Sequence, residues 1–247
     1  KILWNTGINN LFVGVGAGSS DTGPDNTFLG FNSGYTNTTG SGDTFIGSYA
    51  GYSNTTQNYV TAIGSYAGYN NATGENTFLG YKAGYSTTTG GYNTFLGNLA
   101  GYSNTTGRQN LFSGYQAGYS NTTGDFNVYQ GFQAGYSGTN TRYNTLLGYQ
   151  AGYTQATGEL YNSFVGYRAG FSNTTGYSNS AMGSYALYYN TTGSSNSAMG
   201  YYALLNNAAG SYDTAVGAYA GYSNNTGFDN SYFGYNSGYS TTTGSGD

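Results

Sequence analysis

The side chains that most often carry out catalysis are scarce in this chain. Its 247 residues contain no His and no Cys, only nine Asp or Glu and five Lys or Arg. Nucleophile–base pairs, thiolate chemistry and zinc sites therefore lack their usual groups. Glycoside hydrolysis needs two carboxyl groups that converge on one groove, whereas the nine acids are scattered along the sequence. We expect no enzymatic activity and no cofactor.

Asp43 and Asp213 lie at a recurring position where a ladder of carboxylates could bind calcium. Such a ladder needs clustered acids in successive turns, but Asn occupies this position in most other copies, so we favour a structural role and expect no metal site. The net charge of −4 comes without a basic stripe, which argues against nucleic acid as a partner. No run of eighteen apolar residues and no leader-like start are present, so we expect neither a membrane span nor a signal peptide in this sequence.

The residues of interest recur in a tandem repeat of 17 residues. Each copy contains a short apolar segment closed by an anchor glycine, as in Asn26-Thr27-Phe28-Leu29-Gly30. Neighbouring anchors are 17 residues apart except for spacings of 16 before Gly30 and Gly80 and 18 before Gly166. Positions are numbered below from this glycine as zero, and the consensus is N-T-F-L-G-Y-x-A-G-Y-S-N-T-T-G-x-x. We predict a single array over residues 1–247, with about fourteen copies, that is a fragment of a longer repetitive protein.

A unit of this length predicts one coil of a β-solenoid. Seventeen residues are too few for a helix pair or a propeller blade, but they suit two short strands and two turns. Thr, Phe, Val, Ile and Tyr favour strands, and frequent Gly opposes helices. The sequence contains no Asn-Gly dipeptide, which disfavours an array of hairpins. We therefore predict an all-β fold, a parallel β-solenoid or β-roll of about fourteen coils, spaced about 4.8 Å apart.

Parallel stacking places equal positions of successive coils above one another. A charged consensus position would create a column of like charges, whereas neutral Asn, Thr and Tyr can form ladders. Asn or Asp occupies position −4 in thirteen of fourteen copies, and Val60 is the exception. The expected structural ladders contain Gly30, Gly47, Gly80 and Gly97 at the anchor and Asn76, Asn93 and Asn110 at position −4.

Apolar residues occupy both faces of the predicted strand. Positions −3 and −1 share one face and pair a hydroxyl with an apolar residue, as in Thr27 and Leu29, while position −2 on the other face is often Phe. A strand that is apolar on both faces is buried on both, and an exposed column of Phe would promote aggregation. We therefore predict an in-register homo-oligomeric fibre, with a trimer as the first guess and higher cyclic order as an alternative. The rings expected to pack between chains are Phe28, Phe45, Phe78, Phe95 and Phe112.

Position +5 is aromatic in twelve copies, including Tyr85, Tyr102 and Tyr119. We favour packing at a wet interface, and the alternative is an adhesive surface for glycans or target cells. The turn motif Ser-Asn-Thr-Thr-Gly also creates glycosylation sequons, for example at Asn37 and Asn104. We favour turn chemistry over attached sugar there, because Asn and Thr readily bond the local backbone. Ice binding by the Thr columns is a lower alternative, since adjacent Thr residues would point in opposite directions.

Two segments carry a resemblance to known repeats. Residues 76–85 (N-T-F-L-G-Y-K-A-G-Y) and 179–193 (N-S-A-M-G-S-Y-A-L-Y-Y-N-T-T-G) resemble the repeat regions of large secreted tail-fibre-domain proteins from Bacteroidota-like bacteria. They are also similar to head repeats of trimeric autotransporter adhesins, whose N-S-x-A-I-G-x-x-A-x-A-T-G unit builds a parallel β-roll. The resemblance implies secretion to the cell surface and attachment, as in the prey-catching, grappling-hook-type appendages of some gliding bacteria.

We therefore expect a structural and adhesive protein: the shaft of an extracellular bacterial surface appendage that attaches to cells or surfaces. The principal alternative is a phage-type tail-fibre shaft. Both expectations require copies of the chain itself as partners, and the adhesive one adds a target-cell surface or its glycans.

Overall fold

The computed structural model describes residues 2–5 and 9–246. Every regular element in this part of the chain is a short β-strand, and no α-helix is present in it. The chain divides into two compact units, Lys1–Gly124 and Asp125–Asp247, which are described separately.

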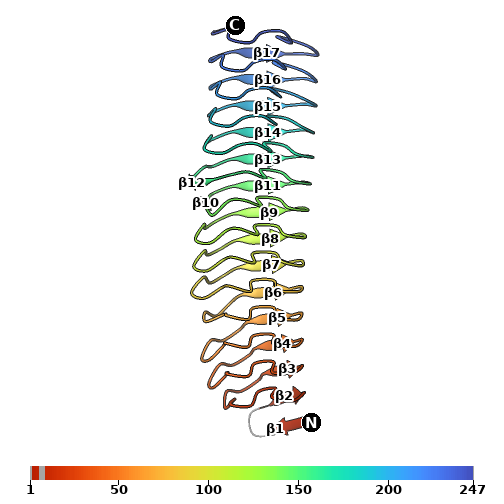
Figure 1. Ribbon diagram of the computed structural model, residues 1–247, viewed down its shortest axis with the longest axis vertical. Coiled ribbons are helices and arrows are strands. Elements are labelled where there is room, and N and C mark those ends of the chain that lie inside the picture. The colour runs from red at the N-terminus through yellow and green to blue at the C-terminus, as the bar shows by residue number, and fades with distance from the viewer. Residues whose placement is uncertain (1, 6–8, 247) are drawn as a thin grey trace. The chain divides into compact units, whose positions relative to one another are not determined.

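In the first unit, one strand from each coil joins a parallel ladder (Figure 1). The ladder consists of β2 (Asn10–Val13), β3 (Thr27–Leu29), β4 (Thr44–Ile46), β5 (Thr61–Ile63), β6 (Thr77–Leu79), β7 (Thr94–Leu96) and β8 (Leu111–Ser113). Equal repeat positions are partners, so that Phe28 pairs with Phe45. One further strand, β1 (Ile2–Asn5), lies outside the repeat and pairs antiparallel with β2.

The second unit repeats this arrangement. Its parallel ladder consists of β9 (Val128–Gln130), β11 (Thr145–Leu147), β13 (Ser163–Val165), β14 (Ser180–Met182), β15 (Ser197–Met199), β16 (Thr214–Val216) and β17 (Ser231–Phe233). A separate parallel pair is formed by β10 (Asn140–Arg142) and β12 (Thr157–Glu159). The prediction of an all-β parallel solenoid is confirmed for both units.

The prediction of two strands per coil is wrong for most coils, which contain a single strand of three residues. The remainder of each coil is bent by residues with positive φ. In the coil of Gly97 these are Tyr92 (φ 61°), the anchor itself (φ 132°), Leu99 (φ 60°) and Gly101 (φ 57°). Left-handed residues at positions −5, +2 and +4 interrupt any extended run. They close the chain into a narrow coil.

The interior of a coil with Phe at position −2 is one aromatic ring wide. Phe side chains at position −2 point inward and stack on those of the next coil, with ring centroids 4.8 Å apart for Phe28 and Phe45 and 4.9 Å for Phe95 and Phe112. Alanine or serine at position +3 lies beside them and is buried in most coils. The expected packing of these rings between chains is wrong, because Phe28, Phe45, Phe78, Phe95 and Phe112 are all 0 % exposed within one chain.

The side chains at positions +4 and −2 share the same interior space of the coil. A Cβ on Gly101 would overlap the ring of Phe95, so glycine is required where Phe fills the coil. In the two coils that contain Leu at position +4, position −2 is Ala: Leu187 accompanies Ala181, and Leu204 accompanies Ala198. Both leucines are fully buried and adopt positive φ. They occupy interior volume that a Phe ring takes in other coils.

Candidate functional site

The Asn residues at position −4 form a buried column that links each coil to the next. The side-chain oxygen of Asn76 accepts a hydrogen bond from the backbone N–H of Asn93 (2.8 Å), and that of Asn93 accepts from the N–H of Asn110 (3.0 Å). In most coils the Nδ2 group donates to a glycine carbonyl in the turn of the following coil, as from Asn93 to Gly107 (2.8 Å). These bonds satisfy polar groups that would otherwise be costly to bury.

A second buried column, at position +7, was not recognised from the sequence. Asn121 donates to the side-chain oxygen of Asn104 (2.9 Å), and Asn190 donates to that of Asn173 (2.7 Å). These residues had the appearance of turn residues or glycosylation sites. Their side chains are 0 % exposed, as is Asn37, so an attached sugar does not fit the folded coil.

The anchor glycines form a column of close backbone contacts. Gly30, Gly47, Gly80 and Gly97 have φ between 131° and 148°. A Cβ at any of them would overlap the backbone of the next anchor glycine. Positive φ and the approach of another backbone both require glycine here.

Two acids, Asp43 and Asp213, are buried, and a third, Asp21, is half-buried. Asp43 takes the place of an Asn at position −4 and accepts hydrogen bonds from the backbone N–H of Val60 (2.8 Å) and the side chain of Asn54 (2.9 Å). Burial raises the pKa of Asp43 to about 7, although these two hydrogen bonds act to lower it. The charge of Asp21 adds to the increase. Burial likewise raises the pKa of Asp21 to about 6 and raises the pKa of Asp213. Within residues 2–5 and 9–246, no group of three or more acidic, His or Cys side chains could hold a metal.

The Tyr residues at position +5 form stacked columns on the surface. Tyr85, Tyr102 and Tyr119 belong to one column, with ring centroids 5.4 Å and 5.2 Å apart and interplanar angles of 10° and 7°. Because each ring covers the face of its neighbour, the column exposes ring edges and hydroxyl groups. Sugar rings bind aromatic residues through the ring face, so this column is a poor platform for glycans.

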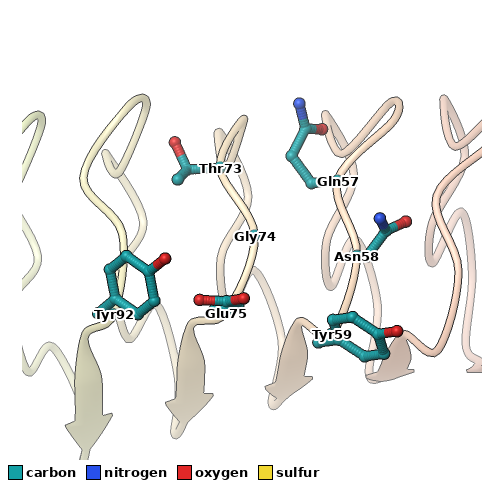
Figure 2. A pocket seen from close by; sticks show the side chains of 7 residues that line it. All are labelled: Gln57, Asn58, Tyr59, Thr73, Gly74, Glu75 and Tyr92. Carbon is teal, nitrogen blue, oxygen red and sulfur yellow. The ribbon is translucent and has the colours of Figure 1, made fainter.

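A recess of about 330 Å³ lies at a corner of the first unit. Figure 2 shows Glu75 between Tyr59 and Tyr92, which occupy the same repeat position in the coils on either side. The Glu75 carboxylate accepts a hydrogen bond that raises the pKa of Tyr92. Glu75 is the one carboxylate that lines this recess, so the pair of acids needed for glycoside hydrolysis is not brought together here.

The outward face of each ladder is exposed, which the sequence did not indicate. It consists of position −3, usually Thr or Ser, and position −1, usually aliphatic or Met, and it contains no charged residue. In the first unit Leu79 is 46 % exposed, and in the second Met182 and Met199 are 54 % and 51 % exposed. A groove of about 240 Å³ runs over β13–β16, where Met182 and Met199 line it. The strand is apolar on both faces, as predicted, but the unpartnered face is this one rather than the Phe face.

In residues 2–5 and 9–246 we find no helix long and apolar enough to cross a membrane. No protein-family model, curated protein sequence or solved structure matches the chain.

Proposed function

We propose that the chain is a shaft segment of an extracellular filament, assembled from identical chains that pack through the outward faces of their ladders. The observation that carries this proposal is an uncharged stripe of half-exposed apolar side chains at position −1 in each unit. In the first unit this stripe includes Ile63, Leu79 and Leu96. Burial of one such side chain contributes roughly 1.5–3 kcal/mol. Exposed in a single chain, these side chains would promote aggregation, and a partner that covers them would prevent it.

A second copy of the chain is the partner that fits this face best. The stripe repeats with the spacing of parallel strands, so the same stripe on another chain has the same period. The absence of charges lets two such faces approach without repulsion. Three chains around a common axis remain the expected arrangement, and attachment at a bacterial cell surface remains the expected role. A phage-type shaft would share this assembly.

Charge placed on the outward face is expected to prevent assembly. Ile63→Glu combined with Leu79→Glu would bury two unpaired carboxylates and raise the dissociation constant about a hundredfold or more, because each 1.4 kcal/mol corresponds to a factor of ten. Sedimentation velocity over a range of concentrations measures the effect. Thr106→Glu, at an exposed turn position, is the control and should assemble like the unmodified chain. A chain that is monomeric at every concentration would exclude the proposal.

Ice binding is a second candidate for the same face. Turn threonines use their hydroxyls internally, as Thr105 does when it donates to the carbonyl of Thr122 (3.0 Å). The hydroxyls of the strand threonines Thr27, Thr44, Thr61, Thr77 and Thr94 make no such bond and repeat once per coil on the outward face. Thermal hysteresis by a monomeric protein would favour this candidate over the filament, and its absence would exclude it.

A further inference from the structure

The surface column of Tyr rings is broken once in the second unit. Tyr136, Tyr153, Phe171 and Tyr188 stack at centroid distances of 5.0 Å, and Tyr222 stacks on Tyr239 at 4.8 Å. The coil between Tyr188 and Tyr222 has Leu205 at this position, which is only 7 % exposed. The leucine is too short to fill the outer part of the column.

The break leaves a recess of about 370 Å³ with Leu205 in its lining. The remaining lining consists of Tyr185, Tyr188, Tyr189, Tyr202, Tyr219 and Tyr222. Here the rings are tilted rather than stacked: Tyr185 and Tyr188 meet at 58°, and Tyr202 and Tyr222 at 87°. Tyr188 and Tyr222 each stack on one ring only, so that the coil of Leu205 covers neither with a stacked ring, whereas Tyr102 stacks on a ring on both sides.

We propose that this recess binds a neutral pyranose unit of a glycan. The ring faces and Leu205 suit the C–H face of a sugar ring, and phenol groups can both donate to and accept from sugar hydroxyls. The lining contains no Lys, Arg, Asp or Glu, which favours a neutral sugar over an anionic one. The inference rests on the adhesive part of the proposed function, but it does not depend on self-assembly.

The competing occupant is a cation. On the preceding coils the Arg168 guanidinium lies over Tyr167 and Phe171, 5.4 Å from each ring centroid. A quaternary ammonium ion could use tilted rings in the same way. No carboxylate lines the recess to assist it, whereas the several phenol groups match the hydroxyl-rich rim of a sugar.

Saturation-transfer NMR with cellotetraose, maltotetraose and chitotetraose tests the proposal on the full chain, with choline as the competing probe. At least one oligosaccharide should bind. Tyr202→Ala combined with Tyr219→Ala should weaken that binding about tenfold or more. Leu205→Tyr should have a similar effect, because it restores the repeat consensus and fills the recess with a stacked ring.

Tyr102→Leu is the matched control, since it breaks the column of the first unit beside Leu99 rather than beside tilted Tyr rings. This variant should bind the oligosaccharide with an affinity within about twofold of that of the unmodified chain, a free-energy difference smaller than the thermal energy RT. No binding by any oligosaccharide, unchanged binding by Leu205→Tyr, or displacement of the sugar by choline would each overturn the proposal. Sedimentation of the same samples reports self-assembly separately, so a failure of the recess and a failure of the filament are distinguishable.

Discussion

Phe95→Ala is expected to lower the free energy of unfolding by about 3–5 kcal/mol, because it leaves a cavity in an interior that is one ring wide. Gly101→Leu alone should cost at least about 3 kcal/mol, since its side chain would overlap the Phe95 ring and a left-handed leucine is strained. The combination recreates the pair found as Ala198 and Leu204.

The double variant should therefore be far more stable than the sum of the single changes. The double variant has two side-chain carbons fewer and one strained left-handed residue, which together predict a loss of about 2.5–3.5 kcal/mol. Guanidinium denaturation of the single and double variants measures the coupling between the two substitutions. The dependence of the unfolding free energy on denaturant concentration should be compared among variants, because a change in its slope would reveal separate unfolding of the two units. Strictly additive losses would show that positions −2 and +4 do not share the same space.

Asp43→Asn is expected to increase stability at alkaline pH and to change it little at acidic pH. The unfolded carboxyl has an ordinary pKa near 3.8, whereas burial raises the folded value to about 7. Ionisation therefore favours the unfolded chain, and the stability of the unmodified protein falls as the pH rises from about 4 to about 7. A difference of about three pKa units corresponds to about 4 kcal/mol.

The Asn side chain fits this position because Asn26 and Asn93 occupy the equivalent one. Its oxygen can accept from the Val60 N–H, and its Nδ2 group can donate to the carbonyl of Gln57, which corresponds to Gly107 in the Asn93 pair. Denaturation midpoints from pH 3 to pH 9 measure the difference. Glu75→Gln, which removes one exposed negative charge from the same unit, is the control and should not reproduce the pH dependence. Equal stabilisation at pH 3 and pH 9 would contradict the assignment.

The repeat sequence was sufficient to predict the fold because its period fixes the register. Once equal positions must stack, the neutral Asn at position −4 and the glycine anchor follow from local chemistry. The number of strands in each coil did not follow, because Tyr92 and Leu99 adopt left-handed conformations that their residue types do not indicate. Tertiary packing overrides the backbone preference of such residues.

The orientation of the strand was ambiguous because both of its faces are apolar. The side chain that fills the coil is Phe95, while Leu96 remains on the outside. A relevant signal was present in the sequence: leucine replaces glycine at position +4 only in copies where position −2 is Ala. That exchange indicates that the two positions share one cavity. The recess around Leu205 could not be predicted, because it depends on the tilt of neighbouring rings.

Strand partners in the parallel ladders are separated by 16, 17 or 18 residues, as Leu11 and Thr27, Thr27 and Thr44, and Thr145 and Ser163 illustrate. Each coil therefore depends on its immediate neighbours and on nothing more distant along the ladder. Duplication or loss of one repeat in the gene would create a junction of the same kind as those already present. The number of coils can thus change during evolution, because a chain that has gained or lost one repeat still folds in the same way.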